Sequence, residues 1–146
     1  MAALSGSLAY FTYTFFEPIL AERLTDFSLT SMQIGLFFAI YPAFYIPGTL
    51  LVQFTPKDIE KRLTLMTAVF LTAIGMIFVG PSSLLGLDDS LLSMAIGTAV
   101  IAFLDAYMLI PSLPEMVEST VPFYPRQERR VNDLASGVFR SMLGIG

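Results

Sequence analysis

The chain has 146 residues, of which 55% are hydrophobic and 14% are charged, with a formal net charge of −4 and a mean hydropathy of +0.71. A soluble domain is typically about 25% charged, so this composition indicates a membrane protein. The sequence contains neither Cys nor His, which removes thiolate catalysis, disulfides, the commonest metal ligand and the usual general base. We therefore expect no enzyme activity, no metal site and no cofactor.

Four apolar stretches are long enough to cross a bilayer. A helix rises about 1.5 Å per residue and the hydrocarbon core is about 30 Å thick, so a span needs roughly 20 mostly apolar residues. The N-terminal stretch lacks the basic region and the cleavage pattern of a signal peptide, so we expect it in the mature protein. The sequence predicts an all-α transmembrane bundle with spans at about 3–24, 31–54, 63–80 and 91–113, and the start of a fifth from about 133.

The first predicted span carries a polar stripe. Gly6, Tyr10, Tyr13 and Glu17 follow one another at intervals of four, three and four residues, which places them on one helix face. A carboxylate beside phenol rings suits an organic cation, because the rings add cation–π attraction to the charge. Pro18 follows directly and frees a backbone carbonyl. The alternative is an interfacial role, since Glu17 is only about two turns from the outer end and Tyr is common at interfaces.

Prolines interrupt the second predicted span. Pro42 comes first, and Pro47 with Gly48 follows. Bends are tolerated in membrane helices when neighbouring helices or waters satisfy the freed backbone groups. We predict a gate or hinge at Pro47 and Gly48, and a static kink is the alternative.

Basic residues gather in the second and fourth connections between the predicted spans, whereas the charged residues of the third connection, Asp88 and Asp89, are both acidic. Positive residues are retained on the cytoplasmic side of a membrane, so these two connections and the N-terminus are expected to be cytoplasmic. Topology accounts for the clusters, and we expect no nucleic-acid partner for this acidic chain. The clusters consist of Lys57, Lys61 and Arg62, and of Arg126, Arg129 and Arg130.

The fourth predicted span contains the deepest charge, Asp105, roughly 21 Å from its outer end at helical rise. A charge at the bilayer centre costs at least about 2.5–3.5 kcal/mol, so such a residue normally faces a bundle interior or a water-filled cavity. It can take and release a proton, or it can make a polar contact between helices in its protonated form. Pro111, Pro114 and Glu115 close this span, and we predict a stop signal combined with a hinge, with Glu115 as a gate or interface contact.

Arg140 is the third charge inside a predicted span, near the start of the fifth. It is expected to snorkel toward the cytoplasmic surface or to pair with a carboxylate of a neighbouring helix. The first and fourth spans share a plan, an acid followed by proline, and they run in opposite directions. This relation is the one expected of inverted three-helix repeats, in which the two helices would be equivalent and would line a central path.

Three segments resemble the C-terminal half of major facilitator superfamily transporters, above all the vesicular amine and polyamine transporters and their drug:proton antiporter relatives. The segments are FFEPILAERL, QIGLFFAIYPAFYIPGTL and MLIPSLPEM, and the similarity extends over nearly the whole chain. It implies that the spans are helices seven to ten and the start of eleven. It also implies that Glu17 belongs to the Glu-Pro motif of helix seven, and that Asp105 lies at or within one residue of the helix-ten acid used for substrate and proton coupling.

The sequence departs from the family pattern in two places. The acid that the family carries on helix eleven falls on Ser136, with Asp133 a turn earlier. In the loop after helix eight, Gln53 stands near the glycine position and Lys57-Asp58 inverts the usual charge order. The resemblance therefore implies a weakened gating contact and an altered part of the proton path.

The resemblance implies a fragment of a secondary active transporter, a proton-coupled antiporter of organic cations that works by alternating access. Its expected partners are the lipid bilayer, protons, a small organic cation and the missing N-terminal six-helix half. Its membrane, whether vesicular, vacuolar or plasma membrane, is not resolved by the sequence. The alternative is a non-transporting accessory or assembly subunit that retains a transporter half-fold.

Overall fold

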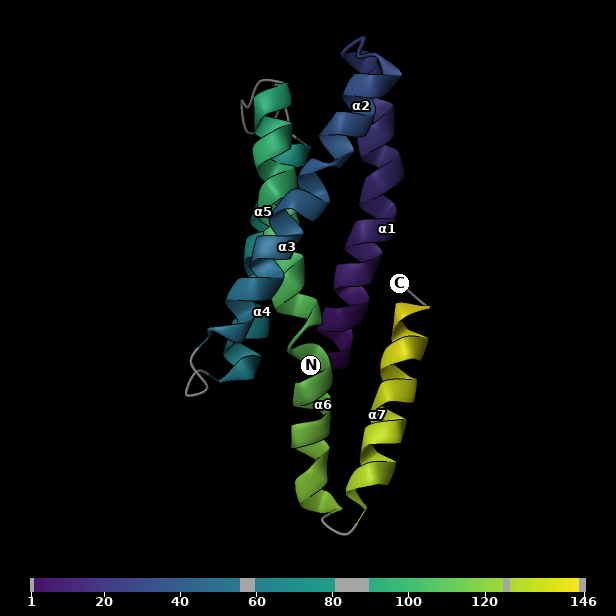
Figure 1. The fold of residues 1–146 in the computed structure, drawn as a ribbon, viewed down its shortest axis with the longest axis vertical. Helices are drawn as coiled ribbons and strands as arrows, with labels where there is room; N and C mark the ends of the chain where they lie inside the picture. The colour runs from purple at the N-terminus through teal and green to yellow at the C-terminus, as the bar shows by residue number, and fades with distance from the viewer. Residues whose placement is uncertain (1, 56–59, 81–89, 125–126, 145–146) are drawn as a thin grey trace.

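The computed structural model describes residues 2–55, 60–80, 90–124 and 127–144, and in these ranges the regular structure is entirely helical. Two of the predicted spans are each divided into two consecutive helices (Figure 1). The elements are α1 (Ala2–Asp26), α2 (Ser31–Phe38), α3 (Ile40–Gln53), α4 (Lys61–Val79), α5 (Leu91–Leu109), α6 (Ser112–Thr120), the short 3-10 helix η2 (Val121–Phe123) and α7 (Glu128–Leu143).

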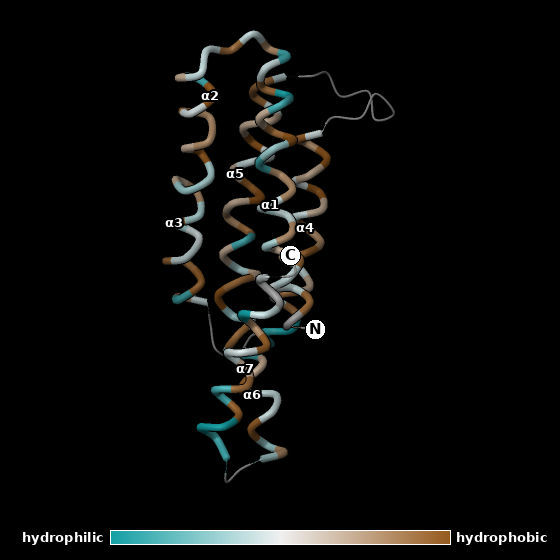
Figure 2. Tube along the Cα trace, turned by 90° about the vertical axis from the view of Figure 1, so that its right-hand side faces the viewer, coloured by the Kyte–Doolittle hydropathy of each residue, from teal (hydrophilic) through white to brown (hydrophobic). Residues whose placement is uncertain are grey.

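The helices run alternately up and down the long axis of the molecule. In Figure 1, α1 rises, α2 and α3 descend, α4 rises, α5 and α6 descend, and α7 rises again beside α6. The hairpin of α6 and α7 extends below the other helices, as the view turned by 90° also shows (Figure 2). The N-terminus, the start of α4 and this hairpin all lie toward the same end, which is the arrangement that the alternating topology predicts.

Within the described residues, three helical stretches are long and apolar enough to cross a membrane: Ser31–Gln53, Lys61–Val79 and Leu91–Phe123. They overlap the second, third and fourth predicted spans, and the last of them extends to Phe123, beyond the predicted end at 113. Helix α1 occupies the first predicted span but is not among the three, because Glu17 and a series of hydroxyl-bearing residues dilute its apolar character. A membrane crossing by α1 therefore stays a prediction.

At the end of the fourth predicted span, where the sequence predicts a stop and a hinge, α5 ends in a bend and a second helix, α6, follows. The chain turns at Ile110 and Pro111 between α5 and α6, and the apolar stretch covers 33 residues in total. Pro114 is the third residue of α6, where a backbone N–H has no partner within the helix, so the proline starts a new helix instead of ending the old one. At helical rise the whole stretch is about 50 Å long, which exceeds a hydrocarbon core of about 30 Å.

Helix α7 begins at Glu128, a few residues before the predicted start of a fifth span, and it is amphipathic. Its apolar residues recur at intervals of three and four, and two of them, Val131 and Ala135, are buried. The ring of Phe139 lies against Gly6 of α1, where an added Cβ would be 3.1 Å from the ring atom Cε2. Arg140 is exposed in the last turn, so the structure places it on the polar side of this helix.

Helix α5 is the centre of the bundle, and both α3 and α4 pack along it. Glycines permit the closest approaches. A Cβ added to Gly97 of α5 would lie 2.9 Å from the backbone nitrogen of Val79 and 3.0 Å from the carbonyl oxygen of Gly75, both on α4. Because these are backbone atoms of a packed helix, they cannot move aside without separating α4 from α5.

Two ion pairs join the start of α4 to α6. Lys61 pairs with Glu118, and the Arg62 Nε lies 2.9 Å from Glu115 Oε1. Exposed pairs of this kind contribute at most about 1 kcal/mol each. They place carboxylates beside the basic N-terminal turn of α4, where the helix dipole is unfavourable for cations. The structure thus places Glu115 in an ion pair between α4 and α6, while a gating role or a contact at the membrane interface stays a prediction.

Replacement of Gly97 by Ala should lower the free energy of unfolding in detergent by about 1–3 kcal/mol, because the new methyl group overpacks the α4–α5 contact. Gly35→Ala is the matched control, since nothing lies within 4 Å of the Cβ position at Gly35. Chemical denaturation followed by circular dichroism measures both variants. Equal stability of the two variants would contradict the close approach of α4 and α5.

Candidate functional site

Asp105 lies at the centre of the candidate site. Its side chain is fully buried, with 0% of its surface exposed, on the part of α5 that packs against α3. The Tyr41 hydroxyl of α3 donates a hydrogen bond to Asp105 Oδ2. The other carboxyl oxygen, Oδ1, has no hydrogen-bond partner among the described residues. A buried carboxyl group with one oxygen bound and one open can still accept a proton or a further donor.

The local sequence explains why Tyr41 reaches Asp105. Gly48 follows Tyr41 by seven residues, or about two helical turns, so both lie on the face of α3 that meets α5. A Cβ at Gly48 would lie 2.9 Å from the Phe103 carbonyl oxygen and 3.1 Å from the Ala106 Cβ. The glycine therefore lets α3 approach the backbone of α5 next to Asp105. In the structure Gly48 acts in close packing, and α3 continues unbroken through the adjacent Pro47.

Three tyrosine rings form a row beside the acid. The Tyr13 ring of α1 lies with its centroid 5.0 Å from that of Tyr41, and the Tyr45 ring stacks on Tyr41 at 6.3 Å. Aromatic pairs at these distances stabilise each other beyond the area that they bury. The row links α1 to α3, and through Tyr41 it links both helices to Asp105.

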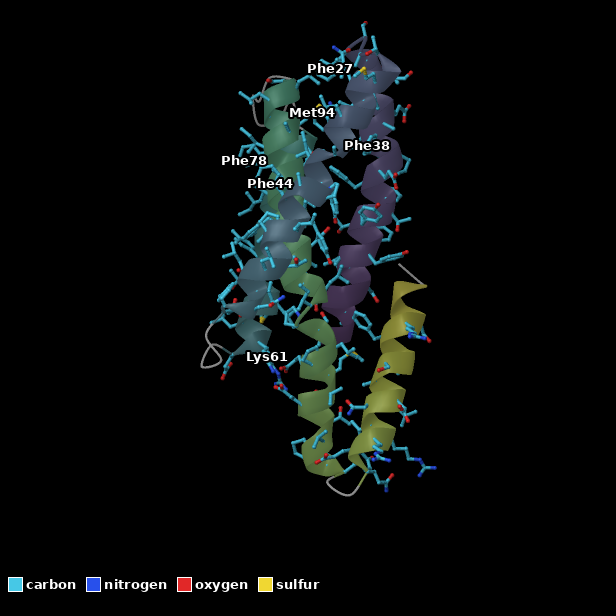
Figure 3. All side chains as sticks on the ribbon, viewed as in Figure 1. Phe27, Phe38, Phe44, Lys61, Phe78 and Met94 are labelled. Carbon is cyan, nitrogen blue, oxygen red and sulfur yellow. The ribbon has the colours of Figure 1, made fainter. Side chains whose placement is uncertain are left out.

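A cavity of about 230 Å³ opens between α1, the α2–α3 junction and α5. Its polar lining consists of a carboxylate and three hydroxyl groups, and the rest is apolar. Phe38 lies in the space between α2 and α1 (Figure 3) and packs against the core cluster that contains Phe16 and Leu20. The lining residues are Tyr13, Phe16, Glu17, Leu20, Phe38, Tyr41, Pro42 and Thr98.

The structure brings together some of the residues predicted for the substrate site. Glu17 and Tyr13 both line the cavity, as the polar stripe of α1 predicts. Asp105 is separated from the cavity by Tyr41, because the described lining includes Tyr41 but not the acid. Tyr10, one turn before Tyr13, is 40% exposed and is not part of this lining. The carboxylate of α1 is therefore open to the cavity, and the carboxyl group of α5 lies behind a phenol.

Three of the residues predicted as gates lie away from the cavity. Pro111, Pro114 and Glu115 sit at the junction of α5 and α6, toward the lower end of the bundle in Figure 1. Ser112 in this junction donates one hydrogen bond to the Met108 carbonyl, and its hydroxyl oxygen lies 3.2 Å from that of Ser5. These contacts hold the junction against both α5 and α1, and its residues are not part of the cavity lining.

Sequence reasoning missed Tyr41, Tyr45 and Thr98. Tyr41 and Tyr45 are four residues apart in an otherwise apolar span and flank Pro42, and this spacing on one helix face was the available signal. Thr98 is fully buried, and its hydroxyl donates to the Met94 carbonyl in its own helix at 2.8 Å. A hydroxyl satisfied in this way gives no signal in the sequence, because its role in the cavity wall depends on the packing of α1.

The chemistry of the cavity suits a cation. It offers the Glu17 carboxylate together with the ring faces of Tyr13 and Tyr41, and aromatic faces attract cations. Within the described part of the chain, no group of three or more acidic side chains is arranged to hold a metal ion. The lining therefore combines one carboxylate with aromatic faces and an apolar remainder.

Comparison of the chain with protein-family models, with curated proteins and with solved structures finds no match. The resemblance to major facilitator transporters accordingly rests on the three sequence segments quoted above.

Replacing Tyr41 by Phe should lower the free energy of unfolding by about 1–3 kcal/mol, because it leaves both oxygens of a buried carboxyl group without a partner. Tyr45→Phe is the matched control, since it removes a hydroxyl from the same row of rings but leaves the hydrogen bond from Tyr41 to Asp105 in place. In a double-mutant cycle with Asp105→Ala, which removes the acceptor, Tyr41 should show a coupling energy of at least about 0.5 kcal/mol. Additive effects of Tyr41→Phe and Asp105→Ala would contradict the hydrogen bond.

Proposed function

We propose that the protein is part of a secondary active transporter that exchanges protons for an organic cation by alternating access. The observation that carries this proposal is the buried Asp105, which accepts a hydrogen bond from Tyr41. Tyr41 also lines a cavity together with Glu17. Ionisable residues inside membrane proteins are expensive and typically mark substrate or proton pathways. The site supplies one carboxylate for a cation and a second carboxyl group for a proton.

The cation binds in the cavity between α1 and α3. Glu17 provides the countercharge, and the rings of Tyr13 and Tyr41 provide faces for a quaternary or protonated amine. The apolar remainder of the lining, including Phe16 and Leu20, accepts the hydrocarbon part of the substrate. Recognition therefore needs one positive charge and an apolar body of modest size.

Proton exchange occurs at Asp105. A cation against the Tyr41 ring stabilises the ionised carboxylate behind it, so Asp105 releases its proton when the cation enters. Protonation of Asp105 removes that attraction and favours release of the cation. The coupling is reciprocal, since each ligand changes the affinity of the other by the same factor. Tyr41 is the positioning residue in this scheme, because its hydroxyl holds the carboxyl group in place.

A second half-transporter completes the site. The cavity of about 230 Å³ is smaller than the 300–1,000 Å³ of typical ligand pockets. Tyr10 and Thr14 on α1 are exposed close to it, which suits a further polar wall better than lipid. The proposed partner is the six-helix half implied by the sequence resemblance, and the bilayer surrounds both.

An accessory or assembly subunit is the second candidate. The observation that favours it is the position of Asp105 behind Tyr41, because a buried acid bound to a phenol also serves as a fixed contact between α3 and α5. In that case the acid specifies how the two helices pack and no proton moves.

In vesicles that contain the protein expressed from its complete gene, Asp105→Asn should abolish uptake of a fluorescent styrylpyridinium cation driven by a pH gradient. Glu17→Gln should raise the KM for the cation by about tenfold, the effect of losing about 1.4 kcal/mol of binding. Glu22→Gln is the matched control, being an exposed acid of the same helix outside the cavity. Uptake by Asp105→Asn at the unmodified rate would contradict the mechanism, and absence of proton-driven cation uptake in the unmodified protein would favour the accessory subunit.

A further inference from the structure

The second span is broken at the level of the cavity. Helix α2 ends at Phe38 and α3 begins at Ile40, and the Ala39 N–H is shared between the Gly35 and Leu36 carbonyl oxygens, each at 3.2 Å. Pro42 has no N–H, so the Phe38 carbonyl loses the donor that an uninterrupted helix would give it. Prolines and shared hydrogen bonds of this kind are the usual causes of a bend.

Helix α2 is held loosely on the outer side of this break. None of its eight residues, all of them within the described part of the chain, is buried, and Met32 is 86% exposed. Its contact with the bundle includes Ile34, Phe37 and Phe38, which pack against the apolar cluster around Phe16 and Leu20. A segment with few buried contacts is the kind that opens at low cost.

Helix α2 is nevertheless built to stay helical when it moves. The Thr30 side chain accepts a hydrogen bond from the Gln33 N–H, and the Gln33 side chain accepts one from the Thr30 N–H at 2.9 Å, which is a capping box. On the other side of the break, Gly48 fixes α3 closely against α5. Movement at the break therefore involves α2 and the first turn of α3, which carries Tyr41, and the rest of α3 from Gly48 onward is the fixed support.

The break forms part of the cavity wall. Phe38, Tyr41 and Pro42 line the cavity from this side, opposite Tyr13 and Glu17 of α1. Tyr41 is also the residue that holds Asp105. A rotation of α2 about the break thus changes the opening of the cavity and acts on the residue that contacts the acid.

We propose that α2 is a lid over the outer side of the cavity, hinged between Ala39 and Pro42, and that Tyr41 links the position of the lid to Asp105. The proposal rests on the proposed function in one respect, which is that the cavity between α1 and α3 is the binding cavity. The lid explains why the second span is interrupted at this level, whereas α3 continues as one helix through Pro47.

Thiol labelling tests the lid without a transport assay. The chain contains no Cys, so Thr98→Cys introduces a single thiol at a cavity-lining position that is fully buried when the lid is closed. A membrane-impermeant maleimide added to sealed vesicles should label this thiol. Met94→Cys is the matched control, since Met94 is equally buried one turn away on α5 but outside the cavity lining.

Two changes at the hinge should shift the labelling rate of Thr98→Cys in opposite directions. Pro42→Ala restores a donor to the Phe38 carbonyl and should slow labelling at least threefold, whereas Ala39→Gly loosens the break and should speed it. Pro47→Ala, in the same span beyond the break, should leave the rate unchanged. Equal rates in all these variants would overturn the lid, as would labelling of Met94→Cys as fast as Thr98→Cys.

The outcome is independent of the transport result. If the labelling rate changes in the hinge variants but the Asp105→Asn variant still takes up the cation, the lid stands and the coupling role of Asp105 is wrong. If labelling ignores the hinge variants while Asp105→Asn abolishes uptake, the proposed function stands and the lid is wrong.

Discussion

A carboxyl group inside a membrane-spanning helix has to be neutralised, hydrogen-bonded or hydrated, and the packing around Asp105 meets this requirement. Ionisation at the bilayer centre costs at least about 2.5–3.5 kcal/mol, so a helix that carries such a group needs a partner. Tyr41 satisfies one of the two oxygens, and the other is open. Because one oxygen is held and one is not, the same group can fix the α3–α5 contact and still change its protonation state.

The remaining features of the bundle serve this contact. Glycines at positions 48 and 97 bring α3 and α4 against opposite parts of α5, which makes α5 the most buried helix and encloses its acid. The Tyr41 ring in turn contacts the Tyr13 ring of α1, and both rings line the cavity together with the Glu17 carboxylate. A charge that arrives in the cavity is therefore separated from Asp105 by a single phenol, a short path for electrostatic coupling in a medium of low dielectric constant.

The sequence predicted the helices and the burial of Asp105 because both depend on local composition. Apolar runs of about 20 residues located the three helical stretches that are long and apolar enough to cross a membrane, and an acid within the last of them had to face the interior. The contact with Tyr41 could not be predicted, since it depends on how closely α3 approaches α5. The prolines near residue 111 mark the bend between α5 and α6. The apolar stretch runs on beyond the predicted end because Pro114 occupies a position of the new helix that needs no N–H donor. Apolar residues spaced three and four apart from Val131 make α7 amphipathic, and a fifth membrane span that starts there stays a prediction.

Infrared difference spectroscopy of the Asp105 carboxyl group tests the central claim most directly. The protein is reconstituted with isotope-labelled aspartate, and spectra are recorded before and after addition of a styrylpyridinium cation, with Asp105→Asn as the reference. The account predicts that the C=O band of the protonated acid loses intensity as the cation binds, and that this change is absent in the reference. Cation binding with an unchanged carboxyl band would show that Asp105 is a fixed structural contact and would contradict its role in proton exchange.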